Sequence, residues 1–202
     1  MKEKFLDVYV AALPNGVADA SLIEHVGRRA ELLAVKNERL FREKFYSWRL
    51  LEKALYLRFS KTPTELLLSK NERGAWVSPF VYLSISHSEG ALAVAVSSSP
   101  VGVDIEAICR LRAKNFAKRI LNEREFSEFE SSEKEGRTEE LVRLWTMKEA
   151  LFKKSGKERF VPSLEDTATG VAWRETVIGK ERFVVSYASS DLEDVDFILA
   201  EL

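Results

Sequence analysis

Residues 101–106 read VGVDIE, and a second stretch, WTMKEALFKKSG, follows at residues 145–156. The first stretch is an apolar, strand-like run that contains two acids, Asp104 and Glu106. Because side chains alternate along a strand, acids two residues apart leave the same face. A carboxylate in a core is costly unless it is paired or bound to a cation. The pair therefore indicates either a cation site or the solvated face of an edge strand whose acids pair with surface lysines.

The second stretch belongs to a helix predicted over 138–154, which has a broad apolar face. Lys148 lies beside the apolar stripe, and Glu149 lies one turn before Lys153. On an isolated helix Glu149 and Lys153 would form an ordinary surface ion pair. If the helix packs near strand 101–108, Glu149 instead becomes a third carboxylate of the acidic site.

The residue types favour a hard cation and phosphate chemistry. Cys109 is the only cysteine and the histidines are His25 and His87, which excludes a Cys/His metal cluster. Three carboxylates suit Mg²⁺, whose shell is usually completed by water and substrate phosphates, and nearby lysines suit phosphate oxygens. Neither a GxxxxGK[ST] nor a GxGxxG motif occurs. His87, between Ser86 and Ser88, fits an anion-binding turn, although a lone histidine is more often structural, as we expect for His25.

Composition excludes several classes of protein. The 202 residues carry 31 basic and 32 acidic side chains, a net charge of -1, whereas nucleic-acid binders are usually basic. No apolar run approaches the ~20 residues of a membrane span. Residues 1–13 lack the apolar core of a signal peptide. We therefore expect a cytoplasmic protein with neither a nucleic-acid nor a membrane partner.

Hydrophobic periodicity predicts an α+β fold. Strands are expected at 5–13, 81–88, 91–99, 101–108, 181–188 and 196–202, and helical regions at 21–59, 62–65, 112–135 and 138–154. Residues 48–55 resemble 145–151 at an offset of 97, and 84–88 loosely resemble 186–190 at an offset of 102. We interpret this echo as a pseudo-twofold duplication of two similar α+β subdomains, 1–100 and 101–202, with the acids in the second and the active site at their junction.

Three motifs together resemble the signature of the 4′-phosphopantetheinyl transferases. SISHS at 84–88 precedes VGVDIE, and WTMKEALFKKSG follows after a spacer of about 40 residues, close to the family pattern [VI]G[VI]D-[VI]E and W-[ST]-x-K-E-[AS]-x-x-K. The matching positions are Gly102, Asp104, Glu106, Trp145, Thr146, Lys148, Glu149, Ala150 and Lys153. The length resembles the monomeric, two-subdomain, surfactin-synthetase-activating type.

This resemblance implies a reaction and residue roles. The enzyme would move 4′-phosphopantetheine from coenzyme A to a carrier-protein serine, with Mg²⁺ or Mn²⁺, and release adenosine 3′,5′-bisphosphate. Asp104, Glu106 and Glu149 would hold the metal, Lys153 and Lys148 would serve the phosphates, and Glu149 would also be the catalytic base. A basic residue near Lys44 would grip the 3′-phosphate of coenzyme A, with Arg39 or Arg42 as the alternatives. The other implied coenzyme A contacts are Arg73, Ser86, His87 and Lys153.

Two departures from the family pattern leave an alternative open. The segment Gly74-Ala75-Trp76 lacks a lysine that relatives often carry, for which Arg73 would compensate. The family's G-x-G-L step reads Gly156-Lys157-Glu158-Arg159. The alternative is an inactive homologue that binds coenzyme A or a carrier protein. The implied partners are acyl carrier proteins or peptidyl carrier domains of fatty-acid, polyketide or nonribosomal-peptide biosynthesis, and the sequence does not choose among them.

Overall fold

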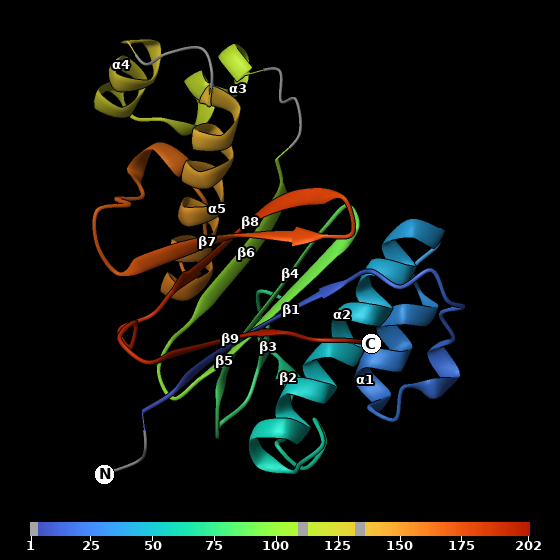
Figure 1. Cartoon of the computed structure of the whole chain (residues 1–202). Helices are drawn as coiled ribbons and strands as arrows, with labels where there is room; N and C mark the ends of the chain where they lie inside the picture. Colours follow the sequence, from blue (N-terminus) through green and yellow to red (C-terminus); the bar gives the residue numbers. More distant parts are fainter. Residues whose placement is uncertain (1–3, 109–112, 132–135) are drawn as a thin grey trace.

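The computed structural model describes residues 4–108, 113–131 and 136–202 (Figure 1). Its main elements are two larger β-sheets and two long helices. The first sheet has the order β4-β5-β1-β9, with bounds β1 Leu6–Ala12, β4 Tyr82–Ser88, β5 Ala91–Ser97 and β9 Val195–Leu199. The second sheet has the order β6-β8-β7, with bounds β6 Gly102–Ala107, β7 Val171–Ile178 and β8 Glu181–Ala188. The α+β class predicted from the sequence is confirmed.

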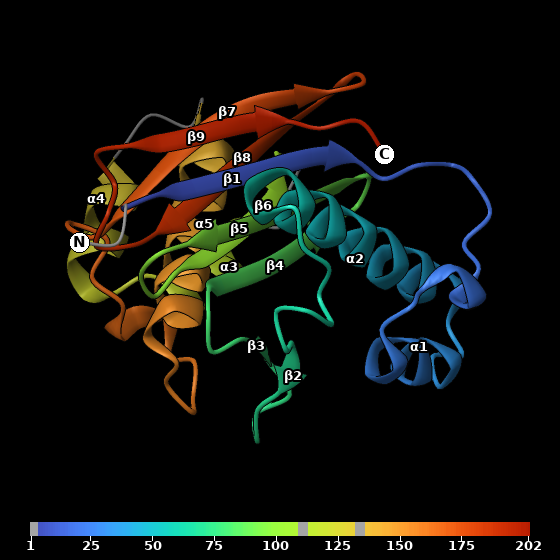
Figure 2. The same ribbon diagram turned by 90° about the horizontal axis from the view of Figure 1, so that it is seen from below.

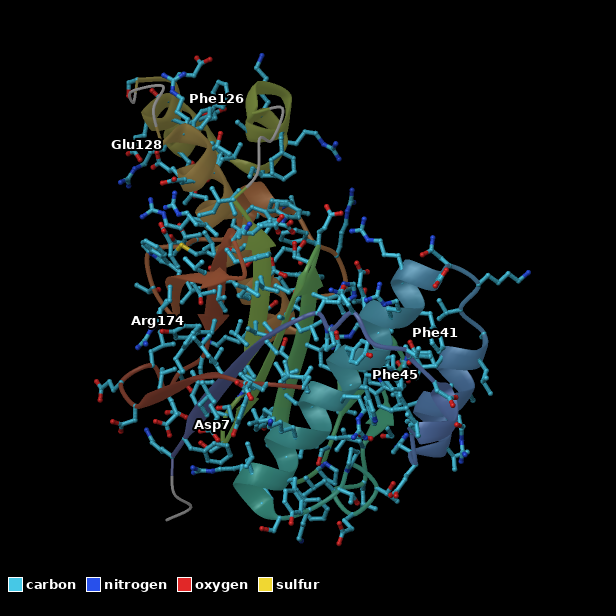
Figure 3. All side chains as sticks on the ribbon, turned by 45° about the vertical axis from the view of Figure 1, so that its right-hand side comes forward. Asp7, Phe41, Phe45, Phe126, Glu128 and Arg174 are labelled. Atoms are coloured by element: carbon cyan, nitrogen blue, oxygen red, sulfur yellow. The ribbon has the colours of Figure 1, made fainter. Side chains whose placement is uncertain are left out.

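The helices lie on either side of these strands. Their bounds are α1 Val26–Leu33, α2 Glu38–Phe59, α3 Ala113–Ile120, α4 Glu123–Ser131 and α5 Arg137–Ser155, with 3₁₀ turns η1 Ala20–Leu22 and η2 Pro162–Leu164. Helix α2 lies along the first sheet, whereas α5 lies beside the second (Figures 1 and 2). In Figure 3, Phe41 and Phe45 mark α2, and Phe126 and Glu128 mark α4 at the opposite end of the molecule.

The first sheet is buried on both faces. Alternate residues of β1 and β5 pack against α2 on one side, among them Tyr9, Leu92 and Val94. The residues between them pack against β6 and β8 on the other side, as Val8 and Ala93 do. This double burial explains why ALAVAVS of β5 is continuously apolar and buried over its whole length.

Strand pairing follows the same plan in both sheets. β4 and β5 form a hairpin whose second strand pairs antiparallel with β1. β7 and β8 form a hairpin whose second strand pairs antiparallel with β6. A long helix lies between the first strand and the hairpin each time, α2 in the first case and α5 in the second. β9 departs from this plan, because it crosses back and pairs in parallel with β1.

Most of the elements predicted from the sequence are present, with two corrections. Residues 62–65 form turns rather than a helix, with the side chain of Glu65 accepting the backbone N–H of Thr62 at 2.7 Å. Strand β7 was not predicted, although it is eight residues long. The predicted helical region 112–135 contains α3 and α4, and its residues 112 and 132–135 lie outside the described part.

Helix α2 is 22 residues long, yet charged residues recur along it. Its N-cap, Asn37, accepts the backbone N–H of Leu40 at 2.9 Å, and Ser60 ends it in a left-handed conformation. Among the described residues no helix is long and apolar enough to cross a membrane.

Gly102 allows α5 to lie directly on β6. A Cβ at this position would stand 1.9 Å from the carbonyl oxygen of Ala150 and 2.6 Å from the backbone nitrogen of Lys154. Both atoms are helix backbone and cannot move aside as a side chain would. The glycine of VGVDIE therefore brings the helix that carries Glu149 against the strand that carries Asp104.

We expect Gly102→Ala to destabilise the protein by about 3 kcal/mol, at the upper end of overpacking costs, because α5 must move away from β6. Urea unfolding followed by circular dichroism measures the loss. Gly74→Ala is the control: its Cβ would meet nothing within 4 Å, so only the strain of a positive φ, about 1 kcal/mol, applies. Equal losses for the two variants would contradict the close approach of α5.

Candidate active site

Asp104 and Glu106 leave the same face of β6, as the sequence predicted. Asp104 is 6% exposed and Glu106 is half-buried. Glu149 of α5 is close enough that the charges of Asp104 and Glu106 both raise the pKa of its carboxyl group. The structure therefore brings together the three acids proposed from the motifs.

Three serines of β4 reach across to β6. The hydroxyl of Ser86 donates to Oδ1 of Asp104 at 2.6 Å, and that of Ser88 donates to Oε1 of Glu106 at 2.7 Å. One step earlier, the hydroxyl of Ser84 accepts the backbone N–H of Val103 at 3.0 Å. We call Ser84, Ser86 and Ser88 the serine seam. It ties the first sheet to the second and orients both acids.

Lys153 is the cation at the centre of the cluster. Its Nζ lies 2.7 Å from Oδ1 of Asp104, 3.1 Å from the hydroxyl of Ser86 and 3.1 Å from the carbonyl oxygen of Val103. The side chain remains 27% exposed. The lysine expected to contact phosphates thus lies among the acids and is open to solvent.

The pKa values of Glu106 and Glu149 are both raised above the ordinary value for glutamate. Burial raises the pKa of Glu106, and the charge of Asp104 adds to this, against the lowering effects of the Ser88 hydrogen bond and of Lys153. Burial also raises the pKa of Glu149, and Lys153 partly offsets it. A group of crowded, partly buried carboxylates is stabilised by any added positive charge.

The donor set fits a hard divalent cation in its chemistry. Its members are carboxylate oxygens, the ligands that Mg²⁺ prefers, and the ammonium of Lys153 already stands beside Asp104 as a cation. Within the described ranges, no three His, Cys, Asp or Glu side chains are arranged as a ready-made metal cage. Lys153 would therefore have to share Asp104 with a bound ion.

His87 lies at the end of β4, between the acids and helix α2. Its Nδ1 is 3.4 Å from Oε2 of Glu43. Burial lowers the pKa of the imidazole, Glu43 opposes this, and the charges of Lys153, Lys44 and Arg28 lower it further. The lowered pKa favours the neutral imidazole, and three cations, Lys153, Lys44 and Arg28, all contribute to it.

The basic residues proposed for coenzyme A have different surroundings. Arg39 is 64% exposed and pairs with Glu43 at 2.8 Å, close to His87. Arg42 instead donates to the carbonyl oxygen of Pro14 at 2.6 Å. Arg73 lies on the turn between strands β2 (Ser69–Lys70) and β3 (Trp76–Val77), where a Cβ on Gly156 would be 3.0 Å from its Nη2. It thus reaches the end of α5, one turn past Lys153.

Lys44 belongs to a second cluster of charges, which sequence reasoning missed. Its Nζ lies 2.7 Å from Oε1 of Glu31, and Lys70 lies 3.1 Å from the same oxygen. Arg28 pairs with the other carboxylate oxygen at 2.7 Å. Burial raises the pKa of Glu31, but hydrogen bonds from these three cations outweigh it and lower the value to about 2. The participants are scattered between residues 28 and 70, so no local motif marks them.

Lys148 does not join the acidic cluster, which corrects the role expected for it at the phosphates. Its side chain is fully buried, and Nζ lies 2.8 Å from Oε2 of Glu125. It also donates to the carbonyl oxygens of Pro162 and Glu165, at 2.9 and 3.1 Å. Lys148 thus fastens α5 to α4 and to the segment around η2.

Comparison with known proteins agrees with this geometry. Residues 100–187 match the model of the 4′-phosphopantetheinyl transferase superfamily. The chain is similar to the 4′-phosphopantetheinyl transferase gsp of Aneurinibacillus migulanus, with 35% identity over 101 residues, and to the 4′-phosphopantetheinyl transferase Sfp of Bacillus subtilis strain 168, with 33% identity over 84 residues.

These likenesses are partial. The aligned residues are 48% and 42% of this chain, and they span 41% and 37% of the two relatives' own lengths. Asp104, Glu106, Glu149 and Lys153 fall inside the segment that matches the superfamily, whereas the serine seam and the cluster around Glu31 precede it.

We expect Lys148→Met to cost about 3–5 kcal/mol of unfolding free energy, because it leaves the charge of Glu125 and two carbonyl oxygens without their partner. Chemical denaturation measures this loss. Combining it with Glu125→Gln should recover part of the loss, and Lys154→Met on the same helix should change stability by less than about 1 kcal/mol. A loss for Lys148→Met no larger than for Lys154→Met would contradict the buried role.

The charge cluster around Glu31 predicts a pH dependence. The folded-state pKa of about 2 lies below the ordinary value of 4.5. The stabilisation is therefore complete above about pH 4.5 and is lost as the pH falls through 2. The stability advantage of the unaltered protein over Glu31→Gln should shrink as the pH falls from 5 toward 2, as urea midpoints at several pH values would reveal. If the stability difference between the unaltered protein and Glu31→Gln were the same at every pH, the ionised carboxylate of Glu31 would not be the group that stabilises the fold.

Proposed function

We propose that this chain transfers the 4′-phosphopantetheine group of coenzyme A to a serine of an acyl or peptidyl carrier protein and releases adenosine 3′,5′-bisphosphate. The observation that supports this most is the meeting of Asp104, Glu106, Glu149 and Lys153 inside the segment that matches the superfamily. The curated relatives bear the name of the same activity. The serine hydroxyl attacks the β-phosphorus, and the bond from phosphorus to the bisphosphate oxygen breaks.

The residues around β6 bind and orient the pyrophosphate. Lys153 lies among the acids and is partly exposed, so its ammonium group reaches a phosphate oxygen once it gives up part of its contact with Asp104. Ser86 donates a hydrogen bond to Asp104 and accepts one from Lys153, and it thereby fixes the positions of both side chains. His87 and the cations near it, Lys44 and Arg28, face the 3′-phosphate at the other end of the nucleotide.

Glu149 is our candidate for the base. A serine hydroxyl is a poor nucleophile until its proton is removed. Because burial raises the pKa of Glu149, its carboxylate is a better proton acceptor than an ordinary glutamate. The charge of Lys153, one helical turn away, partly offsets this rise and favours the ionised carboxylate.

Asp104, Glu106 and Glu149 would hold Mg²⁺, with Mn²⁺ as a substitute, and the bound ion would neutralise charge on the phosphates during transfer. This proposal accounts for the placing of three acids around one face of β6, which would otherwise be destabilising. It also requires Lys153 to give up part of its contact with Asp104, since both cations would approach the same carboxylate.

We also propose that the two halves, 1–100 and 101–202, derive from a duplication and that the active site lies at their junction. The repeated order of strand, long helix and hairpin supports the first point. The serine seam supports the second, because β4 of one half orients acids on β6 of the other. β9 is then a later exchange that completes the sheet of the first half.

The partner is a carrier protein or domain of fatty-acid, polyketide or nonribosomal-peptide synthesis, and the chain acts as a cytoplasmic monomer. Acidic carriers would favour the basic stretch Lys153-Lys154-Lys157 at the end of α5. A second candidate function, an inactive homologue that only binds coenzyme A or a carrier, is favoured by Ala75, where relatives often have lysine. Arg73, at the end of α5, argues against it.

The test is to incubate the protein with coenzyme A, Mg²⁺ and a panel of apo carrier proteins and to measure intact masses. A carrier that gains one phosphopantetheinyl group establishes transfer. Asp104→Asn should slow transfer by about a hundredfold or more, since it removes a charge that would hold the metal. The matched control is Asp194→Asn, an exposed acid before β9, which should transfer at the unaltered rate.

Two results would overturn the proposal. If no carrier gains mass while coenzyme A still binds in a titration, the chain is the inactive homologue. If Asp104→Asn transfers at the same rate as Asp194→Asn, the assignment of Asp104 to the metal site is wrong. Circular dichroism of both variants excludes unfolding as the cause of any loss.

A further inference from the structure

The cluster around Glu31 resembles an anion receptor that already contains an anion. Lys44 of α2, Arg28 of α1 and Lys70 of β2 converge on one carboxylate at 2.7, 2.7 and 3.1 Å. Three cations on three different elements would repel one another without a shared counter-ion. The carboxylate of Glu31 supplies that counter-ion and leaves the cluster with a formal charge of two.

Two of the three cations, Arg28 and Lys70, are also held by contacts other than Glu31. The guanidinium of Arg28 also donates to the backbone carbonyl of Lys44, and it lies 5.3 Å from the ring of Trp48. Nζ of Lys70 lies 5.4 Å from the ring of Trp76, which packs on Trp48 at 4.7 Å. These side chains therefore do not easily turn away from the Glu31 carboxylate to bind an incoming anion.

The receptor lies next to the proposed pyrophosphate site. Nδ1 of His87 lies 3.4 Å from Oε2 of Glu43, the residue before Lys44 on α2, and the charges of Lys44, Arg28 and Lys153 all act on the imidazole. His87 follows Ser86, which bonds Asp104 directly. The groups thus form a continuous series from the acids through His87 to the Glu31 cluster. A nucleotide with its pyrophosphate at Lys153 would bring any further phosphate toward Glu31.

We propose that Glu31 determines how strongly this chain recognises the 3′-phosphate of coenzyme A. The proposal rests on the proposed function, since it concerns the same site. The carboxylate occupies donors of all three cations and repels a second anion beside it. The chain therefore gains little from the 3′-phosphate and binds dephospho-coenzyme A nearly as well as coenzyme A. Glu31 is a specificity-determining residue and takes no part in the transfer itself.

Titration calorimetry in the presence of Mg²⁺ measures this directly, as the ratio of the Kd for dephospho-coenzyme A to the Kd for coenzyme A. We expect a ratio below about 5 for the unaltered protein and a rise of about tenfold in Glu31→Gln, because removing a like charge favours the phosphate. The rise comes from tighter binding of coenzyme A, with dephospho-coenzyme A almost unaffected. The matched control is Glu38→Gln, an exposed acid at the start of α2, which should leave the ratio unchanged.

A ratio that stays the same or falls in Glu31→Gln overturns the proposal. A second measurement needs no variant: adenosine 3′,5′-bisphosphate and adenosine 5′-monophosphate should bind the unaltered protein within about fivefold of each other, for the same electrostatic reason. A preference of about a hundredfold for the bisphosphate overturns the proposal even if Glu31→Gln does not fold.

The outcomes also separate this proposal from the proposed function. If both nucleotides bind but no carrier is modified, the transferase activity fails while the ratio still decides the role of Glu31. If a carrier is modified but the Kd ratio is high and does not change in Glu31→Gln, only the proposal about Glu31 is wrong. If neither nucleotide binds, both proposals fail.

Discussion

The serine seam is the interaction on which the rest of the site depends. An isolated carboxylate in a buried strand is unfavourable, and β6 carries two acids. Ser86 and Ser88 of β4 satisfy them with hydrogen bonds of 2.6 and 2.7 Å. The same bonds hold β4 and β6 side by side, although these strands belong to different sheets. A single row of hydroxyl groups thus lowers the cost of burying the acids and fixes their position relative to the first sheet.

Helix α5 serves the site with one face and the fold with another. Glu149 and Lys153 are one turn apart and both lie beside β6, while Lys148 is bound to Glu125 away from the acids. Five residues of α-helix turn a side chain by about 140°, so Lys148 and Lys153 cannot serve the same ligand. The two lysines of one motif therefore have different surroundings: Lys148 anchors the helix, and Lys153 lies among the acids. Thr146, bonded to Ser186 of β8 at 2.7 Å, fixes the helix at a second point.

Much of this was accessible from the sequence, and the failures have physical reasons. The strands with strong apolar patterns and both long helices were predicted, because burial imposes a period that composition reveals. β7 was not, since it is an edge strand whose exposed residues Trp173, Arg174 and Glu175 break the alternation. The acids and Lys153 could be assigned because they are close in sequence to a recognisable pattern. The Glu31 cluster could not, because its members come together only when α1, α2 and β2 pack.

The last strand has a consequence for how the chain folds. β9 pairs in parallel with β1, so that Leu6 lies opposite Val195. Until β9 has left the ribosome, β1 has one edge of backbone N–H and C=O groups without their final partners. Such an edge is a template for wrong pairing, and nascent chains emerge over many seconds. Completion of the first sheet therefore has to wait for β9, although every other strand of that sheet precedes residue 98.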